Sequence, residues 1–160
     1  VPQEAFLFSD SLTNNVLFGS DEVNEQIAEQ FAEKAVVHDN IDNFKERYET
    51  VVGERGVTLS GGQKQRVSIA RALVNDPSIL IFDDSLSAVY TETEEQILNN
   101  LSSEIKNKTT IIITHRVSSA KRADQILVLE DGRVLANGSN SELLNKQGYY
   151  YELYNKQLLD

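Results

Sequence analysis

A serine and two glycines stand at the predicted start of a helix, in the string Leu59-Ser60-Gly61-Gly62-Gln63. A helix start leaves several backbone N–H groups unpaired and directs them toward one point, where they can bind phosphate. Gly61 and Gly62 have no Cβ, so an anion can approach the backbone, and Ser60 adds a hydroxyl donor. The helix dipole favours the same negative charge. The string therefore predicts a phosphate-binding helix end, although a Ser-Gly-Gly alone also suits an ordinary helix with a flexible start.

Two carboxylates, Asp83 and Asp84, follow the apolar run Ile79 to Phe82. The run is typical of a buried parallel strand, which places both side chains at the C-terminal end of that strand. Asp83 can hold Mg²⁺ directly or through water, as hard oxygen ligands do, and Asp84 can then orient an attacking water. Two solvated aspartates in a turn are the alternative that the pair leaves open when it is taken alone.

Two further residues are candidates for the same site. His115 follows the apolar run Thr109 to Thr114, where a ring nitrogen can hydrogen-bond a γ-phosphate and respond to its loss. Gln3 follows Pro2 in a predicted turn, and its amide can reach a metal ion or a water. A structural histidine and a surface glutamine are the commoner interpretations, so neither residue indicates a site without the others.

A β-α-β unit is predicted to position these side chains. Its strands are the runs Ile79 to Phe82 and Thr109 to Thr114, joined by a helix from Thr91 to Ile105 with a capping-box start. Ahead of the unit, a second helix runs from the glycine string to about Asn75, and Pro77 ends that segment.

The first third of the chain is predicted to be helical. Ser20 or Asp21 can cap a helix that carries its apolar residues on one side. These residues are Val23, Ile27, Ala28, Phe31 and Ala35. A shorter helix is predicted near Ile41 to Phe44, and a loop from Gly53 to Gly56 leads to the glycine string.

A hairpin and helices are predicted to complete the chain. Asp131-Gly132 is a strong two-residue turn between strands at Gln125 to Leu129 and Arg133 to Ala136. The tail from Ser141 to Leu159 is mainly helical in pattern. Helices followed by alternating strands and helices predict an α/β layer fold with a parallel-sheet core.

The composition excludes several classes of protein. With 40% hydrophobic and 25% charged residues, the 160-residue chain is predicted to be one soluble, globular unit. No apolar run approaches the roughly 20 residues of a membrane span, and no segment resembles a signal peptide, so we expect a cytosolic chain. The absence of cysteine excludes disulfides and thiolate metal sites. A net charge of −10 argues against nucleic-acid binding.

Taken in order along the chain, the candidate residues resemble the successive motifs of ABC ATPases. The resemblance covers nearly the whole chain and rests on Gln3, Leu59 to Gln63, Ile79 to Asp84, Ser87-Ala88-Val89 and His115. It implies that Gln3 is the Q-loop glutamine, that Leu59 to Gln63 is the family signature and that Asp83 is the Walker B aspartate. It likewise makes Ser87 to Tyr90 the D-loop and His115 the switch histidine. The loop Val52 to Gly56 and the segments Val1-Pro2-Gln3 and Phe6-Leu7-Phe8 look like those of exporters.

The resemblance implies a partial P-loop NTPase fold with ATP and Mg²⁺ as cofactors. Residues 1–160 would be the C-terminal portion of one ABC ATPase domain, with a helical subdomain at about 8–76 and the rest of the catalytic core at 77–160. Leu59, Ser60, Gly61, Gly62 and Gln63 would bind a nucleotide held mainly by a second ABC ATPase domain. Gln3 and Asp83 would hold the metal, and Asp84 and His115 would be catalytic. The chain would work with transmembrane domains, fused or peripheral to them, at the cytoplasmic face of the cell membrane.

Three departures from the family pattern qualify these expectations. The 160 residues contain no Gly-x4-Gly-Lys-Ser/Thr loop, so the chain is predicted to start partway through the domain. By itself it is predicted to be unable to bind ATP in the normal way, and to expose apolar sheet edges. Asp84 stands where the family usually has glutamate, and a shift on the order of 1 Å can cost roughly 10²-fold in rate. We therefore expect weak hydrolysis at the site of Asp84 and favour a heterodimer over a homodimer. Tyr90 stands where an aspartate is usual.

The leading hypothesis is the ATP-hydrolysing motor of an ABC exporter that moves lipid, peptide or drug-like substrates. An ABC-type ATPase acting on DNA or ribosomes is an alternative, which the acidic charge, the exporter-like loop and the lack of a coiled-coil heptad insert argue against. A catalytically degenerate regulatory ABC domain is a second alternative, favoured by Asp84 and Tyr90.

Overall fold

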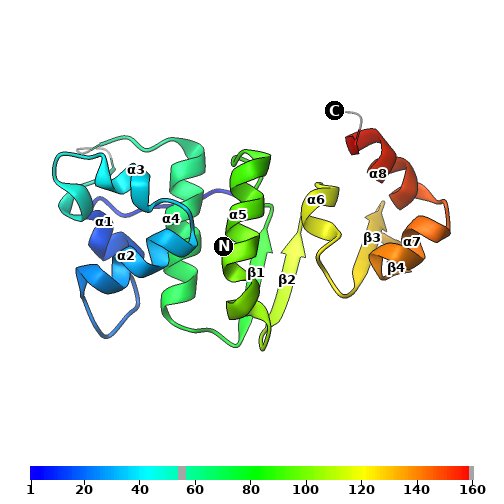
Figure 1. Cartoon of the computed structure of the whole chain (residues 1–160), viewed down its shortest axis with the longest axis horizontal. Helices are drawn as coiled ribbons and strands as arrows, with labels where there is room; N and C mark the ends of the chain where they lie inside the picture. Colours follow the sequence, from blue (N-terminus) through cyan, green and yellow to red (C-terminus); the bar gives the residue numbers. More distant parts are fainter. Residues whose placement is uncertain (54–56, 159–160) are drawn as a thin grey trace. The chain divides into compact units, whose positions relative to one another are not determined.

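The computed structural model of the chain describes residues 1–53 and 57–158. They fall into two units, which divide between Ile113 and Thr114 (Figure 1). The predicted division near residue 76 lies inside the first unit and stays a prediction. Within the predicted exporter-like loop, Glu54, Arg55 and Gly56 lie outside the described residues. None of the described helices combines the length and the apolar character that crossing a membrane requires.

The first unit opens with a helical group packed around one core. Its members are α1 (Leu12–Val16), α2 (Glu25–Lys34), α3 (His38–Asp42), a 3-10 turn at Arg47–Glu49 and α4 (Gly61–Val74). Helix α4 packs against both α1 and α2. The side chains buried among these elements include Leu12, Val16, Ala28, Ala32, Ile41, Tyr48, Val67, Ile69 and Ala70. The helical character predicted for the first third of the chain is therefore confirmed.

The predicted cap of α2 is wrong. The helix begins after Asn24, whose side-chain oxygen accepts a hydrogen bond of 2.9 Å from the N–H of Gln26. Val23 therefore precedes the helix and is 68% exposed, so it is not part of the apolar side. The short helix predicted near Ile41 begins earlier than expected, at His38.

Helix α4 has the bounds that the sequence predicts. Ser60 is its N-cap, and a capping box forms in both directions: the N–H of Gln63 donates to Ser60 Oγ at 3.3 Å, and the N–H of Ser60 donates to Gln63 Oε1 at 2.9 Å. At the other end Arg71 joins α4 to α1, because its Nε donates to the Asn15 carbonyl at 2.8 Å and its Nη2 donates to Asn15 Oδ1 at 2.9 Å. The start and orientation of α4 are thus fixed by side chains.

A parallel β-α-β unit completes the first unit, as predicted. Strands β1 (Ile79–Asp83) and β2 (Thr109–Ile113) pair in parallel, and α5 (Thr91–Ile105) joins them. The predicted capping box of α5 is wrong: Tyr90 is the N-cap and makes no side-chain capping bond. Because Thr91 is itself the first helical residue, Glu94 lies one position too far along the helix to reach back to the cap.

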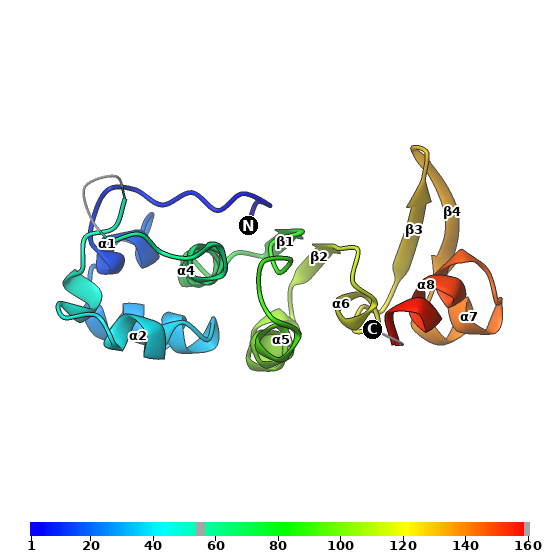
Figure 2. The same cartoon turned by 90° about the horizontal axis from the view of Figure 1, so that it is seen from above.

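One face of this strand pair is covered and the other is not. Leu80 and Phe82 point into the core that α5 completes, whereas no described helix of the unit lies on the opposite face (Figure 2). The expectation of a fully buried strand is therefore wrong, since β1 alternates exposed and buried residues. The exposed residues of the two strands include Ile79, Ile81, Ile111 and Ile113.

The second unit is a hairpin packed on three helices. It contains α6 (Val117–Ala120), β3 (Ile126–Glu130), β4 (Arg133–Gly138), α7 (Asn140–Asn145) and α8 (Tyr149–Leu158). Its core consists of Val117, Ile126, Val128, Leu143 and Tyr150. The predicted hairpin turn is confirmed, because Asp131 (φ 47°) and Gly132 (φ 73°) both have the positive φ of a type I′ turn.

Candidate functional site

The glycine tip, defined as Ser60, Gly61 and Gly62, opens α4 at the surface of the first unit. Ser60 and Gly61 are exposed, whereas the preceding Leu59 is buried and anchors the segment in the core. The capping box uses Ser60 Oγ as an acceptor, so its hydroxyl hydrogen is available to a ligand. Gly61 and Gly62 occupy the first turn, where backbone N–H groups have no helical partner. The tip can therefore present several donors to an anion outside the fold.

The two glycines of the tip have different surroundings. A Cβ placed on Gly62 would lie 2.8 Å from the carbonyl oxygen of Ala88, a distance that requires a backbone shift. A Cβ on Gly61 would only touch the Ala88 side chain, at 3.8 Å. Gly62 is thus required by packing within its own chain, while the surroundings of Gly61 leave room for a Cβ.

The acidic pair, Asp83 and Asp84, lies at the C-terminal end of β1, as predicted. The N–H of Asp84 continues the strand pairing by donating to the Ile113 carbonyl at 2.9 Å. Asp84 itself has φ 44°, which turns the chain sharply after the strand. The Ser87 hydroxyl then donates to the Asp84 carbonyl at 2.7 Å and closes the turn. The backbone of Asp84 is therefore held at both its N–H and its carbonyl.

Gln3 lies beside the acidic pair although 81 residues separate it from Asp84 in sequence. Its Nε2 donates to Asp84 Oδ2 at a long distance of 3.4 Å. Among the described residues, no three His, Cys, Asp or Glu side chains cluster as a ready-made metal site. An amide and a carboxylate are oxygen donors, and Mg²⁺ commonly takes only one or two protein ligands and completes its shell with water and phosphate. Gln3 and Asp83 fit that kind of partial site.

Gln65 is a contact of this site that the sequence analysis missed. It lies on α4, is 4% exposed, and donates from Nε2 to the backbone carbonyl of Gln3 at 3.0 Å. Its Oε1 accepts a hydrogen bond of 3.2 Å from the N–H of Ala88. A helical glutamine carries no sequence signal for such a role.

His115 belongs to the second unit, whereas the other candidates belong to the first. Its backbone carbonyl accepts a hydrogen bond of 2.8 Å from Gln157 Nε2. Gln157 Oε1 also accepts from the N–H of Val117 at 2.8 Å, so α8 fixes the chain on both sides of Arg116. The approach of His115 to the acidic pair stays a prediction. Tyr90 is 87% exposed, and nothing in the structure explains the tyrosine at that position.

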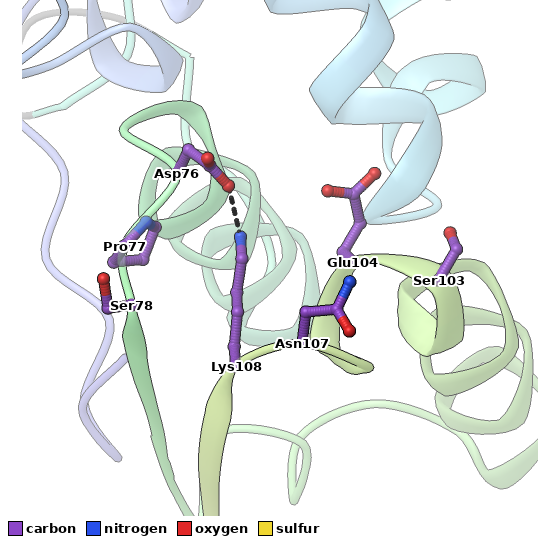
Figure 3. A pocket seen from close by; sticks show the side chains of 7 residues that line it. All are labelled: Asp76, Pro77, Ser78, Ser103, Glu104, Asn107 and Lys108. Carbon is purple, nitrogen blue, oxygen red and sulfur yellow. Dashed lines mark hydrogen bonds and ion pairs between the residues drawn. The ribbon is translucent and has the colours of Figure 1, made fainter.

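A polar hollow of about 380 Å³ lies at the other end of the strand pair (Figure 3). Lys108 crosses it and donates to Asp76 Oδ1 at 2.5 Å, and this hydrogen bond lowers the pKa of the Asp76 carboxyl. Asp76 to Ser78 precede β1 and Lys108 precedes β2, so the hollow lies at the N-terminal ends of the strands. Parallel α/β sheets bind ligands beyond the C-terminal strand ends, where Asp83 and Asp84 lie.

Comparison with known proteins gives a consistent result. Residues 1–87 match the family model described as ABC transporter. The chain is 46% identical over 160 residues to the multidrug resistance-like ATP-binding protein MdlA of Escherichia coli (strain K12). It is 45% identical over 159 residues to the probable multidrug resistance ABC transporter ATP-binding/permease protein YheI of Bacillus subtilis (strain 168). The alignment with MdlA covers 100% of this chain, and the alignment with YheI covers 99% of it. Each alignment covers only 27% of the relative.

A solved structure of a bacterial Atm1-family ABC exporter with ATP bound aligns with 98% of the chain. The TM-score is 0.88 and the sequence identity is 42%, and the aligned part is 27% of that exporter chain. The similarity therefore extends through both units of the fold, while the chain spans about a quarter of the length of the proteins that it resembles.

Proposed function

Because the chain belongs to the ABC transporter family, we propose that it is part of the ATP-driven motor of an exporter. The observation that carries the proposal is the exposed glycine tip of α4, built on the same unit as the acidic pair at the end of β1. These are two half-sites with complementary chemistry, one donating hydrogen bonds to anionic oxygen and the other offering carboxylate oxygen to a metal and a water.

In this proposal each half-site serves a different nucleotide. The glycine tip binds the γ-phosphate of an ATP whose other contacts come from a second ABC ATPase domain. Asp83 and Gln3 hold Mg²⁺, which neutralises charge on the phosphate oxygens. Asp84 accepts a hydrogen bond from the attacking water and orients it, and His115 contacts the γ-phosphate. The 160 residues contain no Gly-x4-Gly-Lys-Ser/Thr loop, so this segment by itself is not expected to bind ATP normally.

The partners and location proposed for the whole protein follow from its relatives. YheI carries a name that joins ATP-binding and permease parts, and the aligned solved structure is an exporter. We therefore place the chain beside transmembrane domains, on the cytoplasmic side of the membrane, in a dimer with a second ABC ATPase domain. The aspartate at position 84 favours a heterodimer whose partner hydrolyses ATP more efficiently.

Asp84 supplies the test of this proposal. Its backbone is fixed by the bonds to Ile113 and Ser87, so the main chain cannot advance to offset a side chain one methylene short. Since a displacement on the order of 1 Å can cost roughly 10²-fold in rate, Asp84→Glu in the full-length protein should raise ATP hydrolysis at its own site by about several-fold or more. Single-turnover hydrolysis, measured with the partner domain's own site inactivated by mutation, reports on the site of Asp84 alone.

The matched control makes the same change far from the acidic pair in sequence. Asp124 is exposed in the second unit, so Asp124→Glu should leave turnover at the wild-type level. Turnover that is unchanged by Asp84→Glu would show that Asp84 does not position the water or that its site never limits the cycle. A full-length wild type without ATPase activity would contradict the proposed function itself.

A further inference from the structure

Gln65 is a buried side chain that contacts the backbone at two points of the candidate site, Gln3 and Ala88. Its amide donates to the carbonyl of Gln3 and accepts from the N–H of Ala88, at 3.0 and 3.2 Å. With 4% exposure it has little access to water, so these two bonds are its means of satisfying the amide. Among side chains of this size, a neutral amide alone supplies a strong donor and a strong acceptor at once.

The backbone of Ala88 contacts one face of α4 at two points. Its N–H is bonded to Gln65, and its carbonyl oxygen lies only 2.8 Å from the position that a Cβ on Gly62 would take. Gly62 and Gln65 are three positions apart, which places them on neighbouring turns of one helix face. The start of α4 therefore fixes the segment that follows the acidic pair.

The Nε2 atom of Gln65 is connected to the acidic pair through Gln3. The bond at the Gln3 carbonyl holds the main chain from which the Gln3 side chain reaches Asp84 Oδ2. A backbone carbonyl anchored on a helix restricts where that side chain can go. One residue of α4 thus connects the glycine tip, the acidic pair and the segment at Ala88.

We propose that Gln65 is a positioning residue for ATP hydrolysis. It keeps the Gln3 amide beside Asp84 while it holds the Ala88 segment against the glycine tip, so that both half-sites keep a fixed relation. It touches neither nucleotide nor metal, and its effect passes through Gln3 and Ala88. The assignment rests on the proposed ATPase function, but the two contacts that define it can be tested without hydrolysis.

Two variants of the full-length protein test the two hydrogen bonds of the Gln65 amide separately. Gln65→Glu keeps the acceptor for Ala88 but loses the donor to Gln3, and Gln65→Met keeps the size of the side chain but loses both. Hydrogen–deuterium exchange of a peptide spanning residues 86–90 should be faster in Gln65→Met and close to wild type in Gln65→Glu. The kcat for ATP should fall roughly 10-fold or more in both, with KM changed less than about twofold, as expected for lost positioning.

The matched control is Gln96→Met, on the exposed side of α5, which should keep the wild-type exchange and kcat. The proposal is overturned if Gln65→Met retains both the wild-type kcat and the wild-type exchange at residues 86–90, since side-chain volume would then be all that matters. If Gln65→Glu unfolds, as its thermal unfolding temperature will show, Gln65→Met still decides. A wild-type protein that does not hydrolyse ATP would contradict the proposed function, whereas the exchange result would still decide the Gln65 contacts.

Discussion

Gly61 and Gly62 are adjacent in sequence, yet only Gly62 is needed by the fold of its own chain. A Cβ at Gly62 would press on the backbone oxygen of Ala88 at 2.8 Å, whereas a Cβ at Gly61 would make ordinary contact at 3.8 Å. Overpacking against backbone typically costs about 1–3 kcal/mol, and replacing glycine by alanine in a helix gains up to about 1 kcal/mol. Gly62→Ala should therefore lower the free energy of unfolding, and Gly61→Ala should leave it unchanged or raise it.

Urea unfolding of the full-length protein, followed at the unit that contains α4, measures the difference. Gly61→Ala is the matched control, because it makes the same chemical change one residue earlier in the same helix start. Equal stability of the two variants would mean that the Ala88 segment can move away from α4 at little cost. That result would contradict the claim that α4 fixes this segment. Both variants should reduce hydrolysis by the partner domain, since both narrow the approach of an anion to the tip.

The contacts of single residues show where prediction from sequence ends. Asp83, Asp84 and the glycine tip lie where the sequence places them, because strand ends and helix starts are local features. Gln65 and Gln157 could not be predicted, since a glutamine on a helix looks the same whether it is solvated or bonded to a distant backbone. Their roles arise from tertiary contacts across 62 and 42 residues.

At the scale of elements, two helices begin with the same device. Ser60 with Gln63 starts α4, and Ser139 with Glu142 starts α7, each forming a complete capping box. The box of α7 contains a titratable group: hydrogen bonds from the backbone N–H and then the hydroxyl of Ser139 lower the pKa of Glu142 below its ordinary value of 4.5. A lowered pKa in the folded state contributes stability above the unfolded pKa, which is lost as the pH falls through the folded value.

Glu142→Gln tests this pH dependence. Glutamine serves the same box in α4, so the variant should keep the box, but it lacks the contribution of the carboxylate and should unfold at a slightly lower temperature than the wild type near pH 7. Between about pH 5 and pH 3 the wild type should lose stability more steeply than the variant, because only the carboxylate must be protonated. Thermal unfolding across that pH range, followed in the second unit, is the measurement. Parallel curves would show that the box of α7 does not contribute to acid sensitivity.

The elements also differ in how well their sequences specify them. Helix α4, the β-α-β unit and the hairpin could be predicted, because each has a continuous apolar pattern and distinct boundary chemistry at Ser60, Pro77 or Asp131-Gly132. The start of α2 could not, since Ser20, Asp21 and Asn24 can all cap a helix and packing selects the last. The bounds of α5 agree with the sequence, but its capping box could not be predicted, because the helix begins at Thr91 itself and Tyr90 takes the cap position.

At the scale of the whole molecule, the exposed face of β1 and β2 determines how these 160 residues behave when they are produced alone. Parallel sheets are normally covered on both faces, but Ile79, Ile81, Ile111 and Ile113 are between 46% and 59% exposed here. Their arrangement on two paired strands makes one continuous apolar surface, which association can remove from water. We expect the 160-residue segment to self-associate through this face at micromolar concentrations.

Sedimentation velocity of the segment, with and without Ile81→Thr and Ile111→Thr, tests this expectation. These residues pair across the two strands, and threonine retains the β-branched shape that suits a strand while removing apolar surface. The double variant should shift the population toward monomer with the β-α-β unit intact, because neither side chain enters the covered core. Val23→Thr is the control, since Val23 is 68% exposed in the helical group away from the strand pair and should leave association unchanged. If all three proteins associate equally, the isoleucine face is not the contact, and the exposed aliphatic side chains of the hairpin, Leu127 and Leu129, are the next surface to test.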